Sequence, residues 1–274
     1  MIYILLPITG IFVGILSTIF GVGGGIIAVP ILYLMFPKIS PQLVISTSMG
    51  MIFINSLINT RNFLKQGKKI TLHFFFTLSL GMTFGVIIGT NIVNSVSPTA
   101  IKKIFGVTLL LVAIKTVFSK TDPRGSKEEW APPIALEAQI KYLLACLLAG
   151  TLAGTTGLGG GAILVPVFIS LLKTPYNWVS FLSNICMGSG ALVGVLSYLF
   201  TKPNSPIFRP ENIGFTQINS VNFGLITLLS LGALLSSKLG VRLGERLDPT
   251  TSKRLFAGLL IIISSKILYN SLNF

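Results

Sequence analysis

The stretch GVGGGIIAVP, Gly21 to Pro30, places four glycines in five positions inside an otherwise continuously apolar segment. Glycine is the poorest ordinary helix former, so the stretch predicts an interruption of the helix. The same pattern returns later in the chain as GLGGGAILVP, Gly157 to Pro166. The predicted fold and function both depend on these two matched interruptions, which we call the first and the second glycine break.

The composition is that of a membrane protein. Of the 274 residues, 51% are hydrophobic and only 10% are charged, whereas a soluble domain carries about a quarter charged residues. Apolar runs of about 20 residues, long enough to cross a bilayer as a helix, recur along the chain. The runs are continuously apolar and lack the alternation of a membrane barrel. We therefore predict an all-α integral membrane protein with several spans.

The apolar runs predict long helices separated by short connections, with one shorter helix after each glycine break. A polar linker rich in proline and charge is expected at 119–139, and a polar insertion at 201–215. The predicted helices cover residues 2–20, 26–36, 42–63, 71–94, 98–118, 140–156, 162–173, 178–200, 216–241 and 250–272.

The chain contains an internal duplication. Gly14–Pro30 aligns with Gly150–Pro166, with identical residues at the glycines and at the final proline. A second match pairs Pro98-Thr99 with Pro249-Thr250, and the insertion at 201–215 accounts for its larger offset. We therefore divide the chain into a first transmembrane repeat at 1–118, the linker at 119–139 and a second transmembrane repeat at 140–274.

The basic residues predict that the two repeats are inverted. The connection at 61–69 carries four Lys or Arg residues and its counterpart at 201–215 carries two, while the next pair, 95–103 and 242–254, shows the opposite bias. Since Lys and Arg mark cytoplasmic loops, corresponding connections face opposite sides. Each repeat then holds three long helices and a glycine-broken hairpin, giving eight to ten membrane segments. The charge pattern leaves open whether the hairpins cross the bilayer or re-enter it.

The glycine breaks are candidate anion-binding sites. Unwound backbone at membrane depth is tolerated only inside protein or beside a wet cavity, and paired breaks in two repeats mark transporter sites. The N-terminus of the short helix after each break carries free N–H groups and a partial positive charge. A close helix crossing is the structural alternative, because glycine is common there too. The candidate residues are Gly23, Gly24, Gly25, Gly159, Gly160 and Gly161.

Neutral hydrogen-bond donors follow each break. The first repeat has Thr47 and Ser48, and the second has Ser183 and Asn184, both near the start of the next long helix. Such groups suit a partly dehydrated oxyanion, although hydrogen bonding between helices is the alternative. All seven acids fall in predicted loops or helix ends, which favours an anion over a cation. The two cysteines form no motif and are read as small core residues, so no metal or cofactor is expected.

The quoted motifs also resemble a known family. The duplicated glycine stretches, the STSMG stretch at 46–50 and the helix starts PTAIKKIFG and PTTSKRLFAG are similar to those of the TauE/SafE sulfite exporter family, also called the toluene-sulfonate uptake permease family. This resemblance covers nearly the whole chain. It implies a plasma-membrane permease for small sulfur-containing anions such as sulfite, sulfonates or sulfoacetate.

These observations together predict a secondary transporter that works by alternating access around a midplane site at the two breaks. The expected partners are a small anionic solute and the lipid bilayer. Nucleic acid is not expected despite the net charge of +14, since the basic residues lie mostly in short connections. No prediction of oligomeric state follows.

An anion channel of the same architecture is the alternative. An intramembrane enzyme based on MGSGA at 187–191 is disfavoured because a nucleophile needs a nearby base.

Overall fold

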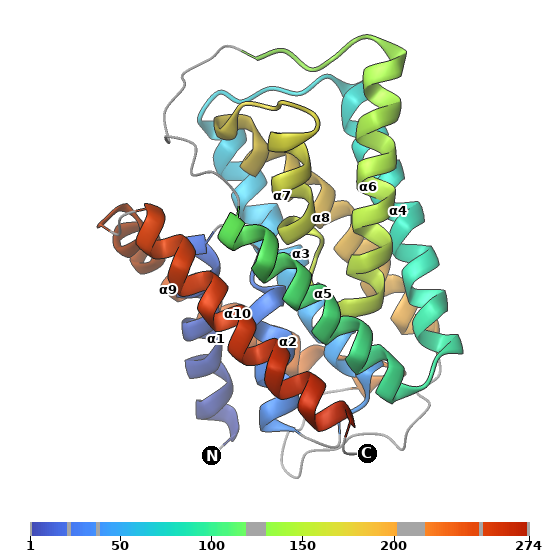
Figure 1. The fold of residues 1–274 in the computed structure, drawn as a ribbon, viewed down its shortest axis with the longest axis vertical. Helices are drawn as coiled ribbons and strands as arrows, with labels where there is room; N and C mark the ends of the chain where they lie inside the picture. The colour runs from blue at the N-terminus through green and yellow to red at the C-terminus, as the bar shows by residue number, and fades with distance from the viewer. Residues whose placement is uncertain are drawn as a thin grey trace.

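The computed structural model describes residues 2–20, 23–36, 39–118, 130–201, 217–246 and 249–272. The described chain is almost entirely helical (Figure 1). It also contains one small antiparallel hairpin of two strands. The elements are α1 (Ile2–Phe20), α2 (Gly25–Met35), α3 (Pro41–Lys65), α4 (Leu72–Ser95), α5 (Pro98–Phe118), α6 (Leu136–Thr156), α7 (Gly161–Ser170), α8 (Tyr176–Phe200), β1 (Gln217–Ile218), β2 (Val221–Asn222), α9 (Phe223–Arg246) and α10 (Pro249–Leu272).

Helices α3 and α8 form the centre of the molecule and run antiparallel to each other. The side-chain amide of Asn59 donates to Asn184 Oδ1 at 3.2 Å. Further along the same contact, a methyl group on Gly188 would lie 2.8 Å from Ser56 Oγ. Because the residue number rises on α8 as it falls on α3, the two helices point in opposite directions. In each of the two helices, 61% of the most apolar 18-residue stretch is buried.

A stripe of glycines joins α4 to α6. A methyl group on Gly81 would lie 2.6 Å from the carbonyl oxygen of Leu143, and one on Gly85 would overlap the carbonyl of Leu147. Small residues let two membrane helices approach until their backbones touch. Since the numbers rise together along both helices, α4 and α6 run parallel (Figure 1).

The same arrangement joins α1 to α9. A methyl group on Gly10 would overlap the carbonyl of Leu229, and one on Gly14 would lie 2.6 Å from the Cα of Ala233. The α1–α9 pair is also parallel, because the residue numbers rise together along both helices. The pairs α1–α9 and α4–α6 each combine one helix of the first predicted repeat with one of the second, and α5 packs against α10 in the same way.

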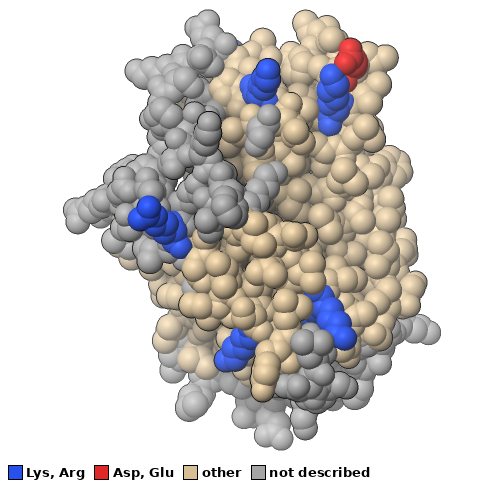
Figure 2. Space-filling model, viewed as in Figure 1, with Lys and Arg blue, Asp and Glu red and all other residues tan. Residues whose placement is uncertain are grey.

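The outward faces of the long helices suit lipid. On α4 the side chains of Phe76, Leu80 and Phe84 are exposed on the side away from the glycine stripe. Among the described residues, four helices are long and apolar enough to cross a membrane: α3, α4, α6 and Trp178–Phe200 of α8. On the face drawn in Figure 2, the described charged residues lie near the upper and lower ends and at the left edge, and a broad uncharged area separates them.

The predicted helix at 216–241 is wrong at its start. Residues 217–222 form the β1–β2 hairpin instead, with Asn219 at a φ of +48° in the turn. The side chain of Asn222 then accepts the backbone N–H of Leu225 at 3.0 Å, which caps α9 so that the helix begins at Phe223. Asparagine tolerates the left-handed turn and also caps helices, which explains why the apolar pattern alone placed the boundary too early.

Other predicted boundaries agree with the helices to within a few residues. One exception is the end of α9, which lies at Arg246 and not at 241. The other is the start of α6, which lies at Leu136, so the C-terminal part of the predicted linker at 119–139 is helix. Residues 119–129 of that linker lie outside the described residues. So does the predicted insertion at 201–215 from residue 202 onward.

We predict that Gly85→Ala lowers the stability of the folded protein by about 1–3 kcal/mol, because the added methyl overlaps the α6 backbone and the helices must separate. The measurement is the thermal unfolding midpoint of the purified protein in detergent. Gly258→Ala is the matched control, since a methyl there meets nothing within 4 Å and alanine favours the helix. Equal midpoints for the two variants would contradict the close α4–α6 contact.

Candidate functional site

The two glycine breaks have the same backbone conformation. Gly23 and Gly159 both have a φ of +76°. Gly24 (φ +79°, ψ −27°) and Gly160 (φ +79°, ψ −16°) follow them and cap the short helices. These angles lie in the left-handed region, which side chains disfavour and glycine adopts freely. The sequence repeat is therefore also a repeat of local structure.

Each break leaves free amide groups at the start of a short helix. The carbonyl of Gly24 accepts the amides three and four residues later at 3.1 and 2.9 Å, and the carbonyl of Gly160 does the same at 3.0 and 2.8 Å. The N–H groups of Gly25 and Gly161 come earlier in the chain than the first amides that bond within each helix, so neither has a carbonyl partner within its own helix. Both glycines are buried. The two helix N-termini thus place partial positive charge inside the protein.

The first break lies against the second. A methyl group on Gly25 would lie 2.6 Å from the carbonyl oxygen of Gly157 and 3.0 Å from the carbonyl carbon of Leu158. The hydroxyl of Ser48, on α3, donates to the same Gly157 oxygen at 2.7 Å. The start of α2, the end of α6 and the first third of α3 therefore meet at one point.

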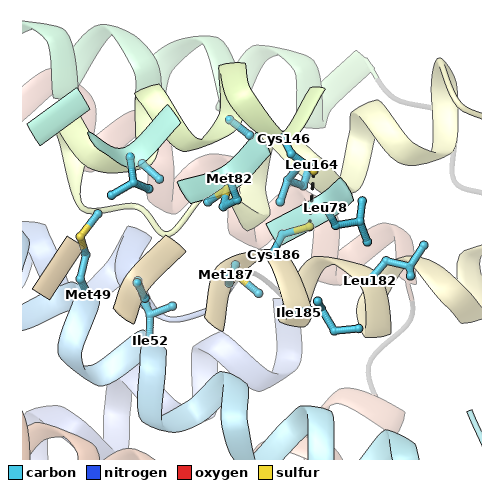
Figure 3. Packing of buried hydrophobic residues seen from close by; sticks show 14 of the residues in the cluster. Met49, Ile52, Leu78, Met82, Cys146, Leu164, Leu182, Ile185, Cys186 and Met187 are labelled. Atoms are coloured by element: carbon cyan, nitrogen blue, oxygen red, sulfur yellow. Dashed lines mark hydrogen bonds between the residues drawn. The ribbon is translucent and has the colours of Figure 1, made fainter. Parts of the chain in front are cut away.

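Apolar side chains from the long helices cover the breaks. A methyl group on Gly159 would lie 2.6 Å from Ile52 Cδ1, and one on Gly23 would lie 2.6 Å from the sulfur of Met187. The same Ile52 Cδ1 would lie 2.7 Å from a methyl group on Gly25, so α3 covers both breaks, whereas α8 covers the first. Met82, on α4, lies nearby in the same buried cluster (Figure 3).

The other predicted polar residues have different surroundings. Thr47 is fully buried, and its hydroxyl has no hydrogen-bond partner within the part of the chain that the structure describes. Ser183 and Asn184 donate to the carbonyl of Ser180 at 3.2 and 2.7 Å. Asn184 also accepts from Asn59. Of the four predicted polar residues, Ser48 is the one with a hydrogen bond to a break.

Within the described part of the chain, no charged side chain is buried near the breaks. Among the residues whose side chains are described, every buried polar residue is Ser, Thr, Asn or Gln. The described acid Glu137 is exposed at the start of α6, where it pairs with Lys141 at 2.6 Å. Helix dipoles and neutral donors therefore dominate the electrostatics around the breaks.

A basic residue stands at one end of the central helix pair. Lys68, in the connection between α3 and α4, places its ammonium 4.1 Å from the centre of the Trp178 ring on α8. Partial burial lowers the pKa of Lys68 from its ordinary value. An ammonium over an aromatic face is attracted by the ring electrons, so the contact ties this connection to the start of α8.

Sequence reasoning did not find the residues that cover the breaks. A signal for Ile52 was present, because it lies one helical turn after Ser48 on the same face of α3 as Ile45, which touches Gly157. Met187 has no such signal, because its role depends on how α8 crosses the first break.

The fold and site define a class of protein. Long apolar helices surround two matched helix interruptions in the protein interior, an arrangement found in membrane transporters. The chain belongs to the sulfite exporter TauE/SafE family, whose family model matches residues 6–267. It is a multi-pass membrane protein of a transporter family.

Curated relatives cover nearly the full chain. A probable membrane transporter protein of Haemophilus influenzae is 31% identical over 96% of this chain and 94% of its own length. One of Methanocaldococcus jannaschii is 26% identical over 93% and 91%. The probable membrane transporter protein YunE of Bacillus subtilis is 22% identical over 98% of both chains. No solved structure matches the chain.

We predict that Ser48→Ala destabilises the protein by about 1–3 kcal/mol, because it removes the donor to the buried Gly157 carbonyl. Thermal unfolding in detergent measures the loss. Ser79→Ala is the matched control, since the buried Ser79 hydroxyl has no partner among the described residues, and its removal should leave the midpoint unchanged or raised. A Ser48→Ala midpoint equal to that of the control would show that the bond contributes nothing.

Proposed function

We propose that this protein is a secondary transporter that carries a small sulfur-containing anion across the cell membrane by alternating access. In this proposal the anion binds between the two glycine breaks. The observation that carries the proposal is the contact of Gly25 with the Gly157 carbonyl, since it brings both interruptions to one place in the protein interior. Two separate breaks facing lipid would offer no common site.

The chemistry around the breaks favours an anion. Two buried helix N-termini supply N–H donors and partial positive charge, and no described acid opposes them. The candidate ligands are the amides of Gly23–Gly25 and Gly159–Gly161 together with the hydroxyls of Thr47 and Ser48. The hydroxyl of Thr47 supports this choice because it is buried and has no protein partner within the described residues. Ser183 and Asn184 complete the set on α8.

Inverted repeats would provide two equivalent states for alternating access. The equivalent helices α3 and α8 pack antiparallel, which supports a two-fold axis that lies across them, in the plane of the membrane. The parallel pairs α1–α9 and α4–α6 exchange under the same axis. Helices α2 and α7, of 11 and 10 residues, reach about 15 Å, half of the hydrocarbon thickness, which supports hairpins that end near the midplane.

Transport also requires that the covering side chains move. In the present structure Ile52 and Met187 pack directly on the breaks, which corresponds to an occluded site. Movement of α3 and α8 relative to the closely packed pairs α1–α9 and α4–α6 would lift these covers and open the site to one side of the membrane. The contacts of Ile52 with Gly159 and of Met187 with Gly23 support this mechanism, because any shift of α3 or α8 changes the break of the opposite repeat.

Uptake into proteoliposomes tests the proposal. Radiolabelled sulfite or sulfoacetate should enter vesicles that contain the protein faster than empty vesicles, and the rate should saturate with concentration. Stimulation by unlabelled anion inside the vesicles would support a carrier, whereas flux without saturation or exchange would favour a channel. Equal uptake rates in vesicles with and without the protein, for sulfite and for the sulfonates, would overturn the proposed function.

We predict that Gly24→Leu and Gly160→Leu each abolish this uptake, because a side chain at a φ of +79° strains the backbone and fills the space before the short helix. Ser189→Ala should transport normally, since that hydroxyl bonds only carbonyls of its own helix, at 3.2 and 3.0 Å. Size-exclusion elution verifies that each variant is folded. Normal uptake by folded Gly24→Leu and Gly160→Leu protein would place the anion elsewhere.

A further inference from the structure

The two cysteines of the chain lie next to each other in the core. Cys146 is on α6 and Cys186 is on α8, 40 residues apart in sequence, and their sulfurs are 3.5 Å apart (Figure 3). Both side chains are fully buried, and both thiols are free. The full sequence contains no other cysteine, so neither thiol has a competing partner within the chain.

The surroundings accommodate a bond between the two sulfurs. A disulfide has a length of about 2.0 Å, so the sulfurs would need to approach by about 1.5 Å. Leu78, Leu164 and Leu182 lie around the pair in the same apolar cluster (Figure 3). Since a disulfide is uncharged, its formation there would bury no charge and would leave no hydrogen-bonding group unpaired.

The pair connects a fixed part of the molecule to a part that covers the site. A methyl group on Gly81 would lie 3.0 Å from the Cβ of Cys146, so this cysteine belongs to the tight α4–α6 crossing. Cys186 directly precedes Met187, which covers the first glycine break. A bond between the sulfurs would therefore join α8 to the α4–α6 pair and hold Met187 in place.

We propose that Cys146 and Cys186 form a reversible disulfide that clamps α6 to α8 and stops transport. The oxidant is a hydroperoxide, of which hydrogen peroxide is small and uncharged enough to enter an apolar core. One sulfur attacks the peroxide, the O–O bond breaks, water leaves and a sulfenic acid forms. The second sulfur displaces the hydroxyl as water, and the S–S bond forms. Two thiols and one peroxide thus give one disulfide and two waters, and a dithiol reverses the step.

The experiment uses the full chain in proteoliposomes, treated with hydrogen peroxide and then divided into two portions. One portion is unfolded, labelled with a maleimide and weighed by intact mass spectrometry, which counts the thiols. The other is assayed for uptake of labelled sulfite or sulfoacetate, before and after dithiothreitol. Cys146→Ser and Cys186→Ser serve as matched variants, because each lacks the bond and retains the methionines that peroxide also oxidises.

We predict that the oxidised wild-type monomer takes up no maleimide and loses its uptake. Apart from any oxygens added to methionine, its mass should fall by two hydrogens. Dithiothreitol should restore both thiols and the uptake, and both serine variants should transport through the whole treatment. Two reactive thiols after peroxide, or a disulfide with unchanged uptake, would overturn the clamp. Its effect on uptake rests on the proposed function, whereas the thiol count does not. If the reduced protein fails to transport, the proposed function is refuted. The thiol count by mass spectrometry then still decides whether the disulfide forms.

Discussion

The structure depends on the hydrogen-bonding requirements of unwound backbone inside a membrane protein. Lipid supplies neither donors nor acceptors, so peptide groups outside a helix must be enclosed by protein. Both glycine breaks meet this requirement by lying against each other and against α3, where Ser48 donates to the carbonyl of Gly157. Glycine is needed because a side chain at Gly25 would collide with that carbonyl. The need to enclose the breaks therefore sets where α2, α3 and α6 can lie.

The two predicted repeats pack closely against each other. The pairs α1–α9, α4–α6, α3–α8 and α5–α10 each take one helix from either side of the polar linker. The glycines of α1 and α4 bring two of these pairs into backbone contact. Because the main helix pairs form between the two predicted repeats, each predicted repeat provides surface that buries the other. Covering of one break by the opposite repeat, through Ile52 and Met187, is the consequence at the site.

Much of this architecture could be predicted from the sequence. Apolar runs placed every helix to within a few residues, apart from the start of α6 and both ends of α9. The glycine pattern predicted both interruptions, and Gly23 and Gly159 have identical φ angles. The start of α9 was missed because Asn219 and Asn222 act through turn and cap geometry, which apolar periodicity does not report. The polar site residues stay predictions, with Ser48 alone bonded to a break among the four proposed on α3 and α8.

The sequence by itself determined the class of protein, the helices and the two points at which helix is interrupted. These properties follow from local chemistry, since hydrophobicity, glycine content and the position of charges act over a few residues. Tertiary structure alone decided that the breaks touch, that Ile52 and Met187 cover them, and that Cys146 lies 3.5 Å from Cys186. Contacts of this kind depend on the angle and depth at which distant helices cross. Those quantities result from packing over the whole molecule, and a single sequence shows no periodic signal for them.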